Sequence, residues 1–195
     1  MILTNNPEWA ESMRRFRNHG MTTDGRQREE GKGWRYDVPG PGWNYRLTDF
    51  QCVLGTSQLK RLPDWLEHRR SLATTYAKAL ESRPGITMLT VRENVEHAWH
   101  LLVVRVNMSK AGIDRDALFM ALRGLGIGAN VHYIPLTMLT RFKSSRGTCP
   151  VAEAAGEAIL TLPIHQGMLI EQVHVVTDAI DTAIAMVAHL DHGGR

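Results

Sequence analysis

The sequence has little of what would place it in several common classes of protein. Only two of its 195 residues are cysteine, Cys52 and Cys149, which are too few and too far apart for a disulfide scaffold or a zinc site. No apolar run approaches the roughly 20 residues of a membrane-spanning helix, and the opening MILTNNPEWAESMRRF lacks the apolar stretch and cleavage site of a signal peptide. We therefore expect a cytoplasmic protein without a membrane or metal partner.

The chain also lacks a large excess of charge of either sign, since its formal net charge is +3 and its sequence pI is about 9.1. The densest basic clusters are MRRFRNHG and EHRRS, in which the arginines stand in helix-forming sequence. Such clusters are typical of solvated helix faces. Nothing resembles a recognition helix or an RNA-binding signature, so nucleic acid is not an expected partner.

The composition and the residue pattern are those of a globular α/β protein. Hydrophobic residues make up 43% and charged residues 22% of the chain, which is typical of globular domains. From about residue 84 onward, strand patterns alternate with helix patterns, which predicts an α/β fold with a boundary near that residue. The expected strands are 86–91, 98–106 and 127–133, and the expected helices are 114–126, 150–160 and 170–190.

Helices and one long loop are expected before that boundary. A short apolar strand is predicted at the start of the chain, followed by a helix that Asn6 caps and Pro7 begins. Residues 21–43 are polar and rich in glycine, which indicates a long loop. Two further helices are expected after this loop, divided at Pro63, and they are 49–61 and 63–82.

The stretch GPGWNYRLTDF, residues 40–50, places Asn44 and Arg46 on a stiff turn that leads directly into a helix. Thr48 and Gln51 form a capping box, so the helix is expected to begin directly after Thr48. Polar side chains on a loop that a rigid element holds are candidates for a binding site. A simpler interpretation stays open, in which the two side chains only close the turn.

The other candidate motifs give weaker signals. GLGIG at 124–128 follows a helix and precedes a strand, the reverse of a phosphate-binding loop, and is expected to end the helix. His97 and His100 are three apart on a predicted strand and face opposite sides, which does not suit a shared metal. His100 is expected to be a hydrogen-bonded core residue, and His165 a capping or surface residue on a loop.

His132 and Tyr133 end a predicted strand just before Pro135, where side chains can reach the crevice at the carboxyl end of a sheet. Packing in the core and contact with a substrate stay open as alternatives for this pair. No Ser-His-Asp or Cys-His arrangement stands out as catalytic machinery.

Four blocks of the sequence carry a family resemblance. They are GWNYRLTDFQCVLGTSQLKRLPDWLEHRRSLATTYAKAL, HAWHLLVVRV, LGIGANVHYIPL and ILTLPIHQGM. Their order resembles that of the sugar aminotransferases of the DegT/StrS type, and the opening MILTNNPEWAESMRRFRNHG is also similar to this family. HAWHL and VHYIP most resemble the members that act at carbon 4 of UDP-linked 4-keto-6-deoxy-N-acetylhexosamines.

The resemblance implies a pyridoxal-phosphate-dependent transaminase that moves an amino group from a donor such as glutamate to a nucleotide-linked keto sugar, in polysaccharide biosynthesis. It implies the C-terminal part of a fold-type-I enzyme of the aspartate aminotransferase superfamily. Residues 1–60 would be the tail of the large cofactor-binding domain, 61–83 a connecting helix, and 84–195 the small C-terminal α/β domain. A homodimer is implied for the full-length form.

The resemblance also assigns roles to four residues. Asn44 is expected to reach across the dimer to the cofactor phosphate of the neighbouring subunit, with Arg46 near the same site. An amide donor and a guanidinium group both suit a phosphate dianion, and a turn before a capped helix would hold them. His132 and Tyr133 are expected to face the substrate, with His132 donating to a sugar or phosphate oxygen.

The chain departs from the family pattern at the catalytic lysine. Members carry the Schiff-base lysine shortly before the segment that matches MILTN, which here is the start of the sequence. The lysines of this chain, none of which stands in that motif, are Lys32, Lys60, Lys78, Lys110 and Lys143. We therefore expect no catalytic residue here and a fragment that is inactive alone. The alternative is a non-catalytic remnant or a partner-subunit module that binds a sugar nucleotide.

Overall fold

The computed structural model describes residues 2–32 and 34–192. The chain divides into two compact units, Met1–Lys60 and Arg61–Arg195. The strands of the described residues form one three-stranded sheet, which lies in the second unit. The predicted α/β character is therefore confirmed, and it belongs to the second unit.

The sheet of the second unit is antiparallel throughout, with the order β1-β2-β3. Its strands are β1 (Ile86–Met88), β2 (Leu102–Val106) and β3 (Ile159–Leu162). Leu102 pairs with Leu162, which fixes the register of the central pair of strands. An isolated bridge between Asn130 and Thr161 adds one further pairing to β3.

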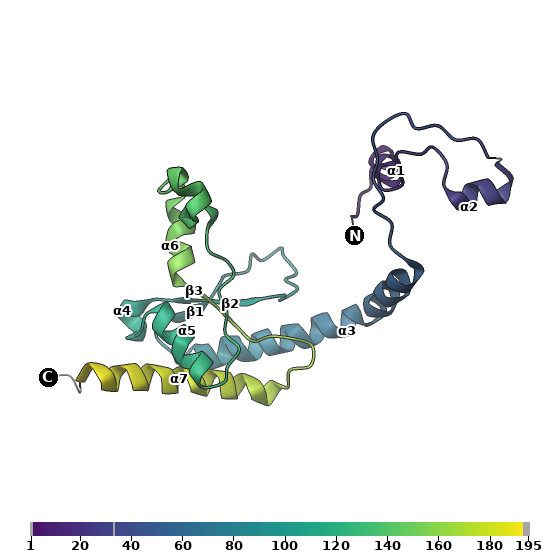
Figure 1. Cartoon of the computed structure of the whole chain (residues 1–195). Helices are drawn as coiled ribbons and strands as arrows, with labels where there is room; N and C mark the ends of the chain where they lie inside the picture. The colour runs from purple at the N-terminus through teal and green to yellow at the C-terminus, as the bar shows by residue number, and fades with distance from the viewer. Residues whose placement is uncertain (1, 33, 193–195) are drawn as a thin grey trace. The chain divides into compact units, whose positions relative to one another are not determined.

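Three helices supply most of the core beside this sheet. They are α5 (Arg115–Gly124), α7 (Ile170–His192) and the part of α3 (Asp49–Leu80) that belongs to the second unit, and they lie together below the sheet in Figure 1. In β2, Leu102 and Val104 are buried whereas Arg105 is exposed, so this strand turns one face to the core. Tyr76 of α3 and Val173 and Ile180 of α7 are fully buried, so each of these helices turns an apolar face to the core.

Short elements connect these parts. They are α4 (Met108–Ala111), η2 (Leu136–Met138), η3 (Thr140–Ser145) and α6 (Pro150–Ala158). Asp114 caps α5 by accepting from the Ala117 N–H at 2.7 Å, as its position before the helix predicts. None of the helices described over residues 2–32 and 34–192 is long and apolar enough to cross a bilayer.

Side chains of α3 hold two loops of the second unit in place. The Tyr76 hydroxyl donates to the Pro163 carbonyl at 2.8 Å. The Arg69 guanidinium donates to the carbonyls of Trp99 at 2.8 Å and Ile164 at 3.3 Å. These carbonyl groups lie just before or after strands of the sheet and accept no hydrogen bond from a neighbouring strand. The side chains of α3 supply their hydrogen-bond donors instead.

The first unit has little core. Its elements are α1 (Pro7–Phe16), α2 (Gly25–Gln27), η1 (Arg28–Lys32) and the first residues of α3. Asn6 caps α1 by accepting from the N–H groups of Glu8 and Trp9, which confirms the predicted cap. Among the residues of this unit whose burial is described, Gly20 alone is buried. Trp9, at 64%, and Phe50, at 79%, remain exposed.

The prediction of two helices divided at Pro63 is wrong, since α3 is one helix with this proline inside it. A proline within a helix removes one backbone donor and costs about 3 kcal/mol. Long runs of helix-forming residues flank it on both sides, QLKRL before and DWLEHRRSLATTYAKAL after. Propagation through these runs outweighs the single lost hydrogen bond.

The strand predictions need three corrections. No strand forms over 127–133 apart from the bridge at Asn130. The strand β3 takes residues that were assigned to the end of a helix and to a loop, because a short apolar run does not distinguish the two by periodicity. Residues 2–5 form no strand and residue 1 lies outside the described residues; Leu3 is 85% exposed and has no partner strand.

Candidate functional site

The turn that carries Asn44 pairs with the residues that follow α1. Residues 43–45 run antiparallel to residues 16–19, and an isolated bridge sets Asn18 opposite Asn44. The backbone bonds are Trp43 N–H to Phe16 O at 2.6 Å, Tyr45 N–H to Arg17 O at 2.9 Å, and His19 N–H to Trp43 O at 3.0 Å. The turn is therefore anchored by main-chain hydrogen bonds and not by side-chain packing alone.

Two glycines permit this close approach. A Cβ on residue 42 would lie 1.9 Å from the backbone nitrogen of Gly20, and a Cβ on Gly20 would lie 2.3 Å from the Gly40 carbonyl oxygen. Gly20 also has a φ of +74°, a conformation that side chains rarely adopt. Any larger residue at 20 or 42 would push the two segments apart.

Four polar side chains at this pairing, Asn18, His19, Asn44 and the following Arg46, form one cluster with Arg46 at its centre. Its Nε donates to Asn44 Oδ1 at 3.0 Å, and its Nη1 donates to Asn18 Oδ1 at 3.1 Å. Its Nη2 lies 3.5 Å from the Nε2 of His19. Two amide oxygens therefore fix the plane of the guanidinium group, while the Asn44 amide nitrogen has no acceptor among the described residues.

Aromatic rings lie beside this cluster. Trp43 stacks on Tyr45 with ring centroids 6.1 Å apart, and Phe16 meets the edge of Tyr45 at 6.3 Å. Trp43 and Tyr45 are nevertheless 57% and 66% exposed. The rings stiffen the turn without enclosing it, so the cluster is open to a ligand.

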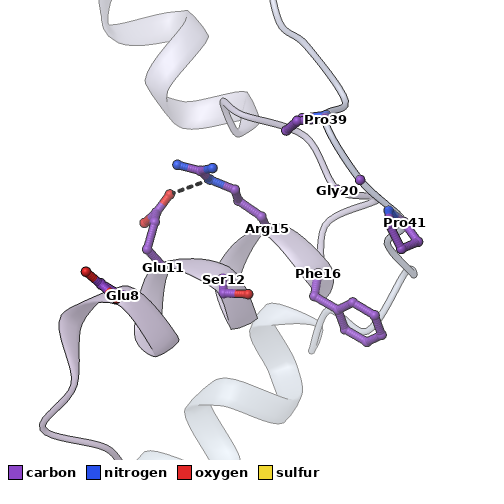
Figure 2. Close-up of a pocket in the computed structure, with 9 residues that line it drawn as sticks. Glu8, Glu11, Ser12, Arg15, Phe16, Gly20, Pro39 and Pro41 are labelled. Atoms are coloured by element: carbon purple, nitrogen blue, oxygen red, sulfur yellow. Dashed lines mark hydrogen bonds and ion pairs between the residues drawn. The ribbon is translucent and has the colours of Figure 1, made fainter.

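A cavity of about 560 Å³ lies between α1 and the segment 39–41. Figure 2 shows the ion pair of Glu11 and Arg15 on the α1 side, with Nε and Oε1 3.0 Å apart, and the two prolines on the other. Its lining residues are Glu8, Glu11, Ser12, Arg15, Phe16, Gly20, Pro39, Gly40 and Pro41. Two carboxylates against one guanidinium group do not favour an anionic ligand here.

His132 and Tyr133 lie at the surface of the second unit. The His132 Nδ1 is 3.0 Å from Thr161 Oγ1, and its Nε2 is 3.2 Å from the amide nitrogen of Asn130. Since the amide nitrogen is a donor, Nε2 accepts and the proton is assigned to Nδ1. Tyr133 is 75% exposed and meets the His132 ring edge-on at 4.8 Å, across a cis peptide bond.

The remaining sequence candidates lie in loops and turns of the second unit. His100 is exposed, so the prediction of a core histidine is wrong; β2 begins only at Leu102, which leaves His100 in the preceding loop. His165 is exposed and accepts from the Gly167 N–H at 3.2 Å, which confirms a capping or surface role. Gly126, with a φ of +80°, follows the end of α5, so the glycines there end a helix as predicted.

Asn18 and His19 were missed as partners of Arg46 by the sequence analysis. A signal was present in RNHG, because a polar pair directly before a glycine at the end of a helix is a typical position for a left-handed turn. His19 has a φ of 59°, and Gly20 follows with a φ of 74°. What the sequence did not show is that this turn pairs with residues 43–45.

Comparison with known proteins places the chain in a family. Residues 1–181 match the DegT/DnrJ/EryC1/StrS aminotransferase family, and the chain belongs to it. It is 33% identical to the spore coat polysaccharide biosynthesis protein SpsC of Bacillus subtilis over 186 aligned residues. This alignment covers 92% of this chain and 48% of SpsC.

Solved structures show the same fold. The Helicobacter pylori aminotransferase PseC, involved in the biosynthesis of pseudoaminic acid, is 26% identical with a TM-score of 0.79, over 94% of this chain and 48% of PseC. Spr1654 of Streptococcus pneumoniae, in its PLP-form, is 28% identical with a TM-score of 0.79, over 94% of this chain and 45% of Spr1654. The chain spans about half the length of the relatives it matches.

Proposed function

We propose that this chain supplies part of a pyridoxal-phosphate-dependent aminotransferase that acts on nucleotide-linked keto sugars, with an amino donor such as glutamate. The observation that carries the proposal is the cluster of Asn18, His19, Asn44 and Arg46, held on a backbone-paired turn. Membership of the family supports the transaminase class, and the relationship to SpsC supports a role in polysaccharide biosynthesis.

The donor set of the cluster fits the phosphate end of the cofactor. The free amide N–H groups of Asn44 and the remaining guanidinium N–H groups of Arg46 can both donate to a phosphate dianion, and the charged guanidinium group is the stronger of the two donors. Pyridoxal phosphate, when bound, would supply the electron sink for amino transfer. We propose that Asn44 and Arg46 hold its phosphate across a homodimer, as donors in a second subunit's site.

The second unit would contribute to the substrate side. Tyr133 presents an exposed hydroxyl group that has no partner among the described residues. His132 could donate to a sugar or phosphate oxygen only if its Nδ1 gave up Thr161, since its other nitrogen accepts from Asn130. We therefore propose that Tyr133 makes the direct contact and that His132 orients it.

A Schiff-base lysine would have to come from another segment or subunit. Such a lysine is normally desolvated or held beside the cofactor, whereas every lysine side chain that the structure describes is exposed. These are Lys60, Lys78, Lys110 and Lys143, while the side chain of Lys32 lies outside the described residues. We propose that residues 1–60 serve as the tail of a large domain, 61–83 as a connecting helix and 84–195 as the small domain.

The test compares Asn44→Ala with Asn5→Ala in a reconstituted full-length form that carries the Schiff-base lysine. Loss of one hydrogen bond to a charged phosphate should weaken retention of pyridoxal phosphate about tenfold. Retention of pyridoxal, which lacks the phosphate, should not change, and neither should Asn5→Ala, which removes an exposed amide of the same type. Equal retention of pyridoxal phosphate by both variants would overturn the assignment of Asn44.

A non-catalytic module is the second candidate, and the exposed lysines favour it for the chain on its own. Borohydride reduction after incubation with pyridoxal phosphate separates the two candidates. A module should give no adduct at a unique residue, whereas peptide mapping of one specifically modified lysine would show a catalytic site within this chain.

A further inference from the structure

A cavity of about 290 Å³ lies in the second unit, beside the loop that joins β1 to β2. Val103 of β2 lines it and stands between Leu102 and Val104, which are buried in the core. Because side chains alternate along a strand, Val103 lies on the opposite face of β2. The cavity therefore lies on the face of the sheet that is turned away from the core, and its apolar lining also includes Leu89, Val95 and Leu101.

Trp99 lines this cavity with a backbone conformation that aromatic residues rarely adopt, since its φ is 49°. Hydrogen bonds fix this conformation at both ends of the residue. The Trp99 N–H donates to His97 Nδ1 at 3.0 Å, and the Trp99 carbonyl accepts from Arg69 at 2.8 Å. Strained residues that their surroundings hold in place gather at binding sites. The half-buried ring of Trp99 gives the cavity a fixed apolar surface.

The same hydrogen bond from Trp99 determines which ring nitrogen of His97 carries the proton. Since Nδ1 accepts, the proton of the neutral ring is assigned to Nε2. The ring centroids of His97 and Trp99 are 4.4 Å apart, and this contact helps to orient the imidazole. The Nε2–H group has no acceptor among the described residues, so the lining of the cavity contains an oriented donor that is free to bind.

Arg92 gives the lining of this cavity a positive charge, and no carboxylate of the described residues lines it. The Arg92 carbonyl accepts from the Val95 N–H at 3.0 Å, which fixes the backbone of the turn that carries this side chain. Glu96 of the same loop pairs with Arg70 of α3, and Arg92 has no carboxylate partner within residues 2–32 and 34–192. An apolar lining with one cation and one free N–H group favours an anion that carries an apolar body.

We propose that this cavity binds a small carboxylic acid with an apolar body, such as an aromatic monocarboxylate. Its carboxylate accepts from the Nε2–H group of His97 and pairs with Arg92, while its apolar body lies against Trp99 and Val103. The volume of the cavity is at the lower limit of small-molecule sites, which suits a ligand of this size. None of these residues has a role in the proposed transaminase function, so the proposal does not rest on that function.

The experiment titrates the full chain with benzoate and follows the heat of binding and the indole N–H resonances of the tryptophans. Benzoate should shift the resonance of Trp99, which Trp99→Phe identifies, and should leave that of Trp65 on α3 unchanged. Benzamide has the same ring without the charge, and acetate has the charge without the ring. Each should bind at least about tenfold more weakly than benzoate, because each lacks one of the two contacts.

Arg92→Gln should weaken the binding of benzoate about tenfold, which corresponds to one lost charge-assisted contact. The matched control is Arg105→Gln, which removes an exposed guanidinium group from the same face of β2 but outside the lining of the cavity. Both side chains are exposed, so both variants should fold as the wild type does.

Four outcomes would overturn the proposal. Benzoate could fail to shift the Trp99 resonance, or Arg92→Gln and Arg105→Gln could weaken binding equally, as a diffuse basic surface predicts. Benzamide could bind as tightly as benzoate, which would show an apolar patch that does not recognise a carboxylate. Glutamate could displace benzoate at equal concentration, which would show a site for the polar amino donor. The outcome of the Asn44→Ala test does not affect these results, because Asn44 lies in the first unit.

Discussion

The interactions that stabilise the first unit differ in kind from those that stabilise the second. The second unit has a continuous core of buried side chains from the sheet and three helices, with Leu118, Leu160 and Val173 fully buried. The first unit has backbone pairing, helix caps and two glycine contacts, and almost no buried side chains. The comparison shows that main-chain hydrogen bonds between two segments can hold polar side chains at hydrogen-bonding distance from one another. A hydrophobic core under these segments is not required.

The difference extends to the exposed surface. In the first unit the exposed apolar residues include Ile2, Trp9, Trp34, Trp43, Leu47, Phe50, Val53 and Leu54. Single exposed apolar residues are ordinary, but many of them on one small unit mark an interface or a site of aggregation. We therefore expect the first unit to be only marginally stable until another polypeptide surface covers these side chains.

Hydrogen exchange should show the largest difference between the units. In a monomer, amides of residues 86–190 within the sheet and helices should exchange only on global unfolding, whereas residues up to 45 should exchange by local opening. The expected gap is at least about a thousandfold, since global unfolding of a small domain costs 5 kcal/mol or more. Mass spectrometry of peptides from both units measures it, and equal protection would show that the first unit has a stable core of its own.

The sequence predicted the second unit better than the first, for physical reasons. Periodic apolar residues identify α7, and a cap residue identifies the start of α5, because both signals are local. The run at 159–162 was assigned to helix and loop, since its strand character depends on pairing with β2. Asn44 and Arg46 could be selected from the turn, but Asn18 could not, because its contact depends on a pairing across 28 residues of sequence.

A substitution of Gly42 should disrupt the backbone pairing of the first unit and leave the structure of the second unit unchanged. In Gly42→Ala the new Cβ would meet the Gly20 nitrogen at 1.9 Å, so the two backbone segments must separate. We expect loss of the nuclear Overhauser contact between the α protons of Asn18 and Asn44, and a cost of about 2 kcal/mol or more to the unit. The urea midpoint of the second unit should not move.

The matched control for this substitution is Gly55→Ala, on the part of α3 that belongs to the first unit. Its Cβ would meet no atom within 4 Å, and alanine should strengthen the helix by up to about 1 kcal/mol. Retention of the Asn18 to Asn44 contact in both variants would mean that the close approach of Gly20 and Gly42 does not hold the turn.

The smallest expected effect concerns a single hydroxyl group in the core of the second unit. Tyr76 is fully buried, and its hydroxyl donates to the Pro163 carbonyl at 2.8 Å. Burial raises the pKa of Tyr76 well above its ordinary value of about 10. The folded chain therefore keeps this side chain neutral at a pH where the unfolded chain ionises it.

Tyr76→Phe should lower the free energy of unfolding by about 1–2 kcal/mol at neutral pH, because the Pro163 carbonyl loses its donor inside the protein. In the wild type, the contribution of Tyr76 is complete below pH 10 and falls as the pH rises further, since only the unfolded chain releases the proton there. The variant should lose that part of the alkaline fall, so the two curves should converge above pH 10. Urea unfolding at pH 8 and pH 11 measures both effects, with Tyr36→Phe, an exposed tyrosine of the first unit, as the control. A constant difference between wild type and Tyr76→Phe at both pH values would contradict the raised pKa, and no difference at pH 8 would contradict the hydrogen bond.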